Sequence, residues 1–419
     1  MPRKPAKTQG PQKQIEPDGS GIRIRMYRVG FGDSFLIELP TKDGPKYILV
    51  DCGVHARGNI HTIQSVVEDI SAVTKENLAI LIATHAHQDH VSGFGSMESQ
   101  FSRFKINEVW LPWTENPKDR EATSLRKKQL ALLGTLRAHF AAAAPNSPAA
   151  EAVLNMSGNQ RAMDALHSGF GVGAKVRYLE AGLDDLEAPG KINGLIVKVL
   201  GPPRDAEFLA KMNPPASQHY LRLDASGRVV SANGVQPFEE KWKVKRGYRR
   251  APVVEDEKAL IENTTAPLSD LAFALDQAVN NTSVVVLFEY RGHNLLFAGD
   301  AQYGNWKFWL EQANSDDILR QVDFYKVAHH GSVNATPKSA LEKMGDGNLA
   351  AMVSTQDVPW PSIPEKKLMQ ALDKRTGHEV VRSDSLAIAG VTDAPRGPRM
   401  KKLPSHFSAG PLFYEYVIT

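Results

Sequence analysis

Residues 84–90, THAHQDH, place three histidines and one aspartate within six positions, directly after the apolar run LAILIA. The apolar run predicts a short strand that is buried on both faces. Neutral imidazoles and carboxylates are ligands of divalent metals, and two histidines one residue apart can reach one ion if the backbone turns after the strand. A polar surface loop explains this density of ligand-type residues less well. The segment therefore predicts a metal site at the end of a buried strand.

The composition restricts the ligands and the partners. Cys52 is the only cysteine, so a multi-cysteine zinc knuckle and an internal disulfide are both excluded, and metal ligands must be His, Asp or Glu. The formal net charge of +3 is close to neutral for 419 residues, so the whole-molecule charge does not predict a polyanionic partner. Any argument for nucleic acid must come from local clusters of basic residues.

The order of the patterns predicts an α/β fold. Strand-like segments at 22–29, 34–40 and 46–53 precede a helical pattern at 61–73 and the apolar run before the histidines. We expect a helix at 118–144, a second helix within 146–170, and a strong hairpin within 281–300. Residues 204–270 lose clear periodicity and carry several Pro and Gly, which indicates an insertion.

The first 20 residues are rich in Pro, Lys and Gln, which predicts a disordered basic tail ahead of one domain at 21–419. This tail lacks the apolar stretch of a secretory signal. No segment approaches the roughly 18 consecutive apolar residues that a membrane span needs. We therefore expect a cytoplasmic protein without a membrane partner, and the sequence does not indicate its oligomeric state.

Several motifs occur together in one order. The run His85-Ala-His87-Gln-Asp89-His90 resembles the H-x-H-x-D-H signature of the metallo-β-lactamase superfamily. DCG at Asp51, FAGDAQ at Asp300 and KVAHHGS at 326–332 resemble the later motifs of that superfamily. More narrowly, GFGDSFLI, VLGPP, NNTSVVV, LLFAGDA and KVAHHGS follow the order seen in the soluble hydrolase domain of ComEC-type competence proteins.

The resemblance implies a metallo-β-lactamase-like four-layer αβ/βα sandwich, with two mixed β-sheets face to face and two divalent ions, Zn²⁺ or Mn²⁺, in loops along one edge. It implies that the first ion is held by His85, His87 and Asp300. The second ion would be held by Asp89, His90, Asp300 and a histidine of HHGS, for which the resemblance favours His329, since it follows the small residue Ala328.

The resemblance also suggests three catalytic residues. Asp89 is a catalytic candidate as well as a ligand, and His330 would stand behind the ligands or contact the substrate. Asp51 would orient a histidine ligand or the attacking water, as carboxylates behind metal ligands do, although a structural role in a strand-end turn is the alternative. Asp33, in the GFGD turn, is equally compatible with a site role and a structural role.

Two departures from the family pattern affect the site. Many superfamily members supply a further histidine for the first ion in G-H-T-x-G-S, where this chain has NNTS at 280–283. Asn280, Asn281 or water would complete the shell, and such oxygen-richer coordination suits Mn²⁺, while His167, His219 and His293 are possible substitutes. Ser362 stands near the place of a histidine in the Gly-His-Pro motif that is frequent in ComEC-type proteins.

These features predict a metal-dependent phosphodiester hydrolase, a nuclease that acts on DNA or RNA through a metal-bound hydroxide. The segment KWKVKRGYRR at 241–250 mixes basic and aromatic residues, which suits phosphate contact and base stacking, although a solvated loop is the alternative. Asn281, Ser332, Lys243 and Arg246 are the candidate substrate contacts. A hydrolase of a small ester, thioester, amide or cyclic nucleotide, and a non-catalytic metal-stabilised binding scaffold, remain alternatives.

Overall fold

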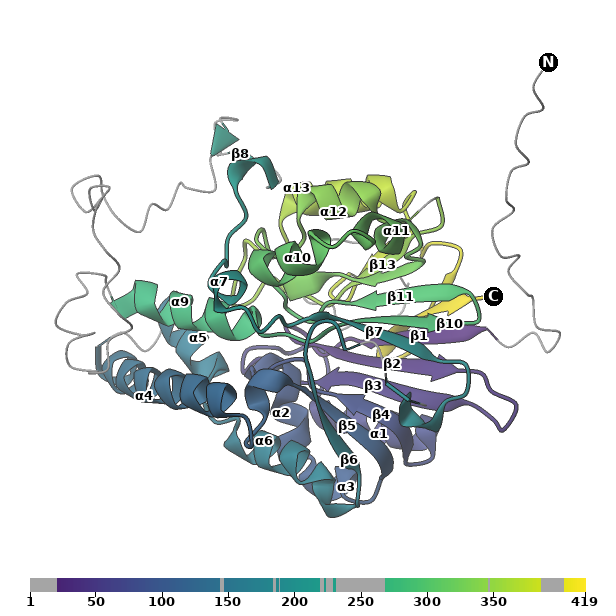
Figure 1. Ribbon diagram of the computed structural model, residues 1–419, viewed down its shortest axis with the longest axis horizontal. Helices are drawn as coiled ribbons and strands as arrows, with labels where there is room; N and C mark the ends of the chain where they lie inside the picture. The colour runs from purple at the N-terminus through teal and green to yellow at the C-terminus, as the bar shows by residue number, and fades with distance from the viewer. Residues whose placement is uncertain are drawn as a thin grey trace.

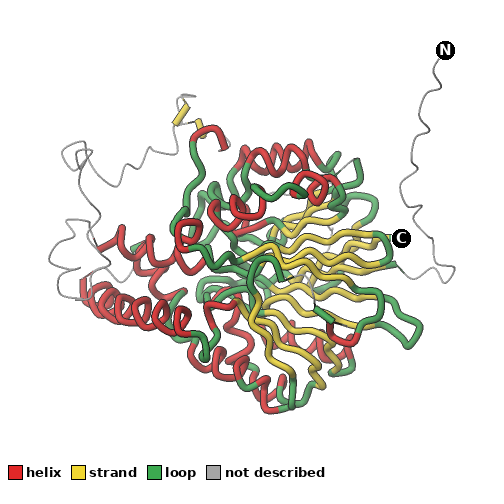
Figure 2. The backbone as a smooth tube through the Cα atoms, in the orientation of Figure 1, coloured by secondary structure: helices red, strands yellow, loops and turns green. Residues whose placement is uncertain are grey.

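A computed structural model describes the chain at residues 21–143, 147–183, 186–187, 189–218, 222–223, 229–230, 268–345, 347–385 and 403–419. Two layers of strands lie against each other, with helices on the outer sides and at one end (Figures 1 and 2). The basic tail at 1–20, the basic segment 241–250 with Lys243 and Arg246, and His219 lie outside the described residues.

The first sheet has eight strands in the order β15-β16-β1-β2-β3-β4-β5-β6. They are β1 Ile22–Tyr27, β2 Ser34–Leu39, β3 Lys46–Cys52, β4 Asn77–Ile82, β5 Lys105–Pro112, β6 Lys175–Leu179, β15 Phe407–Ala409 and β16 Phe413–Ile418. Pairing is antiparallel from β15 to β3 and parallel from β3 to β6. This sheet is therefore mixed, and β3 and β4 end at the same edge.

The second sheet has six strands in the order β14-β13-β12-β11-β10-β7. They are β7 Ile196–Gly201, β10 Val285–Tyr290, β11 His293–Phe297, β12 Phe324–Lys326, β13 Ala350–Val353 and β14 Val380–Arg382. The pairs β7–β10 and β10–β11 are antiparallel, whereas β11 to β14 run parallel. A separate pair joins β8 Arg222–Leu223 to β9 Val229–Val230.

The main core fills the space between the two sheets. Phe35 of the first sheet and Phe297 of the second meet there with their ring centroids 5.8 Å apart. β4 is buried on both faces, as its apolar run predicts: Ile80 and Ile82 face this core, and Leu81 faces the outer helices. Burial of such strands on both faces supplies most of the hydrophobic driving force for this arrangement.

Helices cover the outer face of each sheet. Outside the first sheet lie α1 Ile63–Thr74, α2 Gln88–Ser96, α3 Glu98–Phe101 and α6 Gln160–His167. Outside the second sheet lie α10 Tyr303–Leu310, α11 Ser315–Arg320, α12 Lys338–Lys343 and α13 Lys366–Arg375. The order helix, sheet, sheet, helix confirms the predicted four-layer αβ/βα sandwich with two mixed sheets.

A further group of helices packs at one end of the sandwich (Figure 1). It consists of α4 Arg120–Ala143, α5 Pro148–Asn155 and α9 Leu268–Asn280, which share a small apolar core. Leu136 and Phe140 of α4 meet Val153 of α5 and Leu275 of α9 in this core. We call α4, α5 and α9 the end layer. It brings α5, which follows β5, against α9, which precedes β10.

The remaining elements are short. They are α7 Ala206–Leu209 and the 3₁₀ turns η1 Trp113–Glu115, η2 Gly169–Gly171, η3 Pro189–Lys191, η4 Ala216–Gln218 and η7 Ala328–Gly331. The single helix expected within 146–170 is two helices, α5 and α6, because the chain turns at Gly158, where φ is +77°. β7 and β10 are neighbours in the sheet although residues 202–284 separate them in the chain, and much of this stretch lies outside the described residues.

Candidate metal centre

The ligand-type residues of both sheets meet at one edge of the sandwich. The histidine motif follows β4, Asp300 follows β11, and His330 follows β12. All three strands belong to parallel sets, and parallel strands carry their following loops to the same edge of a sheet. The motif itself is the turn from β4 into α2, in which His87 precedes the helix and Asp89 lies in its first turn.

Four of these residues form a compact buried group: Asp89, His90, Asp300 and His330. Each offers one ligand atom, and these atoms lie within 4.8 Å of one another. His330 Nε2 is 3.0 Å from Asp89 Oδ2 and 3.1 Å from Asp300 Oδ2. His90 Nε2 is 3.1 Å from Asp300 Oδ2 and 3.8 Å from Asp89 Oδ2. We call these four residues the central group.

In the two histidines of the central group, the other ring nitrogen, Nδ1, forms a hydrogen bond with a neighbouring protein group. His330 Nδ1 lies 2.9 Å from the carbonyl oxygen of Ser354, and His90 Nδ1 lies 2.8 Å from Asp51 Oδ2. A carbonyl or a carboxylate only accepts, so Nδ1 must be the donor in both cases. Nε2 of each neutral imidazole is then left with its lone pair toward the centre, which is the arrangement of metal-ligating histidines.

The central group is strongly coupled electrostatically. Burial on its own lowers the pKa of a histidine, but the carboxylate of Asp300, with others nearby, raises the pKa of His330 to about 10. Against the same effect of burial, Asp300, Asp89 and Asp51 hold the pKa of His90 well above its usual value. Burial raises the pKa of a carboxyl, yet His90 and His330 hold that of Asp89 well below its usual range. Ion pairs therefore hold the group together where no cation is present.

Asp51 is fixed from two sides. Its Oδ1 accepts the backbone N–H of Thr84 at 2.7 Å, and its Oδ2 accepts the Thr84 hydroxyl at 2.8 Å and the His90 ring N–H. The backbone of Asp51 has φ +57°, a strained value for a residue with a side chain. Asp51 thus stands where the expected orienting residue should stand, directly behind His90.

Asp33 belongs to the same network, together with a residue that the sequence analysis missed. Asp33, Asp51 and His90 form a second buried group of ligand-type residues. The ammonium group of Lys326 forms an ion pair with Asp33, lies 3.4 Å from Asp300 Oδ1 and donates to the Gly299 carbonyl at 2.9 Å. Burial lowers the pKa of a lysine, but Asp33 and Asp300 together hold that of Lys326 above its usual value. Lys326 offsets part of the buried negative charge.

His85 and His87 lie beside the central group, with His85 and His90 ring centroids 4.2 Å apart. Both side chains are 1% exposed, and within the described part of the chain neither Nε2 atom has a hydrogen-bond partner. Burial lowers the pKa of His87 to about 4, so its ring is neutral at pH 7. Two buried neutral imidazoles with unpaired Nε2 atoms fit a divalent cation, which would supply the missing partner.

The two histidines of HHGS lie differently from the expected arrangement, in which the resemblance favours His329 as the ligand. His330 enters the central group, whereas His329 Nδ1 lies 3.2 Å from Asn334 Oδ1 and His329 Nε2 lies 3.4 Å from Asn280 Nδ2. Both backbones are left-handed, with φ +47° and +53°, so the chain turns twice after β12. This turn points the ring of the second histidine, and not of the first, at the two aspartates.

Two candidate substrate contacts are engaged elsewhere. The Asn281 amide is fully buried, donates to the carbonyls of Phe208 and Leu209 at 3.1 and 2.8 Å, and accepts the Asn305 N–H at 3.0 Å. It therefore holds α7 in place and is not free to contact a substrate. Ser332 is 8% exposed and donates to Asn334 Oδ1 at 3.0 Å. Ser332 therefore helps to fix the side chain of Asn334, which contacts His329.

The proposed histidine substitutes lie elsewhere as well. His167 pairs with the hydroxyl of Tyr178 at 3.0 Å, and His293 lies 3.6 Å from Asp323. Neither ring belongs to the clusters of ligand-type residues found within the described residues. The first ion position therefore gains no third imidazole from either residue.

The end layer contributes residues that the sequence analysis did not single out. Asn155 of α5 donates to Asp89 Oδ1 at 2.9 Å and accepts the Asp89 backbone N–H at 3.2 Å. Asn159, which directly precedes α6 and lies outside the end layer, donates to the Ala86 carbonyl. Asp276 of α9 lies with Oδ1 3.7 Å from His87 Nε2. Burial, with Asp89 and Asp300 nearby, raises the pKa of Asp276 well above its usual value. No motif marks these residues, because only helix packing brings them to the site.

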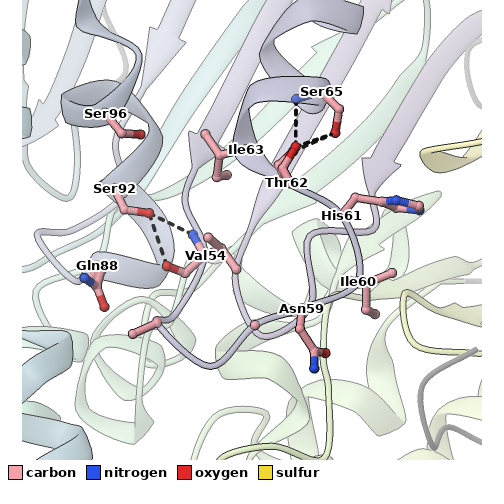
Figure 3. A pocket seen from close by; sticks show the side chains of 12 residues that line it. Val54, Asn59, Ile60, His61, Thr62, Ile63, Ser65, Gln88, Ser92 and Ser96 are labelled. Carbon is pink, nitrogen blue, oxygen red and sulfur yellow. Dashed lines mark hydrogen bonds between the residues drawn. The ribbon is translucent and has the colours of Figure 1, made fainter. Parts of the chain in front are cut away.

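A cavity of about 690 Å³ adjoins the motif on the outer side of α2 (Figure 3). The loop at 54–63 forms one wall, and Gln88, Ser92 and Ser96 of α2 form the other. No Asp, Glu, Lys or Arg lines the cavity among the described residues. It therefore suits an uncharged polar part of a ligand better than a phosphate group.

No helix in the described ranges has both the length and the hydropathy that crossing a membrane requires.

One comparison with known proteins, the match to a family model, agrees with the motifs. Residues 27–119 match the family model of the metallo-beta-lactamase superfamily, and this segment contains Asp51 and the whole histidine motif. No curated protein matches the chain. Among solved structures, the chain is similar to the metallo-beta-lactamase fold protein YhfI from Bacillus subtilis (10% identity, 87% of this chain and 97% of that chain covered, TM-score 0.36). It is also similar to unliganded yeast PDE1, with the same identity and coverage and a TM-score of 0.35.

Proposed function

We propose that this chain is a metal-dependent phosphodiester hydrolase and that its substrate is nucleic acid. The observation that carries the proposal is the central group, in which Asp89 and His90 from the first sheet meet Asp300 and His330 from the second. The match of residues 27–119 to the metallo-beta-lactamase superfamily supports the same chemistry.

The candidate ligand atoms form two sets, one for each of two metal ions. The central group would hold one ion, and His85 and His87, with Asp300 shared, would hold the other. Zn²⁺ and Mn²⁺ both fit a mixture of imidazole and carboxylate ligands. Bound divalent ions would lower the pKa of a coordinated water and offset the charge that develops on phosphodiester oxygens in the transition state.

The side chains behind the ligands keep the donor atoms in place. Asp51 and the Ser354 carbonyl set which nitrogen of His90 and of His330 faces the centre. Asn155 holds Oδ1 of Asp89, so Oδ2 is the oxygen turned toward His330. Such fixed ligands are already close to the geometry that the reaction needs, which reduces the cost of reorganisation.

The charge at the centre makes cations a requirement for an anionic substrate. Asp33, Asp89 and Asp300 are each 1–2% exposed, and Lys326 is the buried lysine that faces them. Even with Lys326, His90 and His330 positively charged, these three carboxylates and that of Asp51 outnumber the cations, so a negatively charged phosphodiester is not attracted to the metal-free centre. We therefore expect substrate binding only after divalent ions have bound.

The test is cleavage of supercoiled plasmid, single-stranded oligonucleotides and RNA by metal-stripped protein reloaded with Mn²⁺ or Zn²⁺. His87→Ala and Asp300→Ala each remove a ligand and are expected to lower the rate by at least about 100-fold, because charge stabilisation at the reacting group is lost. His293→Ala is the matched control, since His293 lies in a hairpin of the second sheet and outside the metal centre.

Cleavage that persists in both ligand variants would show that this centre does not carry the activity. Turnover of p-nitrophenyl esters or β-lactams, with no turnover of bis(p-nitrophenyl) phosphate or nucleic acid, would overturn the phosphodiester proposal.

One observation favours a second candidate function, hydrolysis of a small ester, thioester, amide or cyclic nucleotide. The cavity beside α2 has no Asp, Glu, Lys or Arg among its described lining residues and has the size of a small-molecule site, and Gln88 joins it to the histidine motif. The substrate panel above separates the two candidates, because a small-molecule hydrolase would leave plasmid and RNA intact.

A further inference from the structure

We propose that Asp276 of α9 is a ligand of the first ion, in the place where the chain lacks a third imidazole. The inference rests on the proposed function only in requiring that the centre binds divalent ions. It gives α9 a role that no sequence motif assigns to it.

The first argument is geometric. Asp276 Oδ1 lies 3.7 Å from His87 Nε2, and no other ion-pair contact is found for this carboxylate within the described residues. Two donor atoms that share one tetrahedral ion at about 2.0–2.1 Å are roughly 3.4 Å apart. The separation is therefore too long for a hydrogen bond and close to that of two ligands of one ion.

The second argument is the cost of burying this charge. The Asp276 side chain is only 16% exposed, and no lysine or arginine in the described ranges lies within ion-pair distance. Its neighbours include Asp89 and Asp300, which add repulsion. A buried carboxylate among other carboxylates is unfavourable unless a cation lies between them. Without a cation this carboxyl favours its neutral form, whereas a divalent ion placed between it and His87 would stabilise the ionised form.

The third argument comes from the unpaired atoms around it. Within the described chain, His85 Nε2, His87 Nε2 and Asn280 Oδ1 are buried without a hydrogen-bond partner. Asn280 stands one helical turn after Asp276, and its amide nitrogen lies 3.4 Å from both Asp276 Oδ2 and His329 Nε2. The last turn of α9 therefore carries a carboxylate beside the unpaired Nε2 of His87, and a buried amide oxygen without a hydrogen-bond partner.

The connection of α9 explains why a ligand can come from this helix. α9 ends at Asn280, and the segment Asn280–Ser283 takes the place of the family's histidine motif. A side chain one turn earlier on the helix can reach the position that the missing histidine would occupy. Replacement of an imidazole by a carboxylate gives a harder ligand set, which favours Mn²⁺ relative to Zn²⁺.

The test measures metal uptake, not turnover. Wild type, Asp276→Asn and Asp270→Asn are stripped, titrated with Mn²⁺ or Zn²⁺, and analysed for bound metal per chain and for melting temperature. Asp270 lies on the same helix, so its variant deletes the same charge away from the centre. We expect two ions for wild type and for Asp270→Asn, and at least about tenfold weaker binding of one ion for Asp276→Asn.

Melting temperature separates a ligand from a structural residue. Metal-free Asp276→Asn is expected to melt at or above the temperature of metal-free wild type, because a largely buried carboxyl beside other carboxylates has been removed, and to gain less from added metal. Asp276→His restores an imidazole. We expect this variant to recover binding of the ion that Asp276→Asn binds weakly, and to prefer Zn²⁺ to Mn²⁺ at that position.

Uptake of two ions by Asp276→Asn with unchanged affinity would overturn this inference and leave the proposed function intact. A lower metal-free melting temperature for Asp276→Asn, combined with no recovery in Asp276→His, would assign Asp276 a purely structural role and also overturn it. Wild-type protein that binds no divalent ion would overturn both proposals.

Discussion

At the residue scale, the metal centre depends on which ring nitrogen each histidine exposes. Asp51 and the Ser354 carbonyl take Nδ1 of His90 and of His330, so Nε2 is the atom available to an ion. His90 and His330 also form ion pairs with Asp89 and Asp300. Protons and metal ions therefore compete for the same two nitrogens.

This competition predicts a pH dependence of metal binding. His330, with its pKa raised to about 10, is protonated at pH 8, and an ion must displace that proton. We expect apparent affinity to rise by about tenfold per pH unit for each displaced proton until pH approaches the raised pKa. Calorimetry in buffers of different ionisation enthalpy measures the number of protons released.

The same pKa shift predicts a stability effect of opposite sign in the metal-free chain. A raised folded pKa contributes stability that is present below the unfolded histidine pKa of about 6.5, and this contribution is lost as pH rises through about 10. Metal uptake at pH 8 without proton release would contradict the metal-binding prediction, in which the incoming ion displaces a proton from His330.

At the scale of elements, the end layer connects distant segments to the metal centre. α5 carries Asn155, which holds Asp89, and α9 carries Asp276 beside His87. Both helices pack on α4 through one apolar core. The end layer is separate from the core between the sheets, so its packing can be weakened while the sandwich stays folded.

A pair of substitutions in α4 tests this connection. Leu136 is fully buried in the core of the end layer, whereas Leu130 on the same helix is 61% exposed. We expect Leu136→Ala to cost about 2–5 kcal/mol of local stability and to weaken metal binding, since α5 and α9 lose their support. Leu130→Ala is expected to change stability by less than about 0.5 kcal/mol and to leave metal binding unchanged.

Hydrogen exchange of α5 and α9, together with metal titration, measures both effects. Unchanged metal affinity in Leu136→Ala, despite faster exchange in the two helices, would show that the end layer does not support the centre.

At the scale of the whole molecule, the centre joins the two sheets. Asp89 and His90 follow the first sheet, and Asp300 and His330 follow the second, so ions held by all four would link the halves of the sandwich. The unfolded chain does not bring these four residues together, so ions bind the folded state in preference to the unfolded one. Metal binding therefore makes the folded state more stable.

Metal removal is therefore expected to lower the melting temperature by several degrees. Free ion at about 100 times its Kd adds about 2.7 kcal/mol to the folded state. Scanning calorimetry with and without a chelator measures the shift. Asp300→Asn should show little shift, and His293→Ala should show the wild-type shift. Equal melting temperatures of the metal-loaded and stripped wild type would contradict a structural link between the sheets.

How much the sequence predicts depends on how local the determinant is. The apolar run before Thr84 predicts a strand buried on both faces, which the structure confirms. The four-layer sandwich, also confirmed, is implied by the family resemblance of the motifs and not by local patterns. The histidine motif is a local signal as well, because its residues share one strand-to-helix turn. Patterns within a few residues are sufficient for the strand and the histidine motif.

Other features were decided only by the tertiary structure. Whether His329 or His330 faces the aspartates depends on two successive left-handed turns after β12, and neighbouring identical residues carry no signal that separates them. Asn155, Asp276 and Lys326 lie far from the motif in the chain and reach the centre through helix packing and strand pairing. Local sequence therefore determined the strand, the turn and the first ligands, while long-range packing determined which side chains surround them, because burial and charge act between residues that only the folded chain brings together.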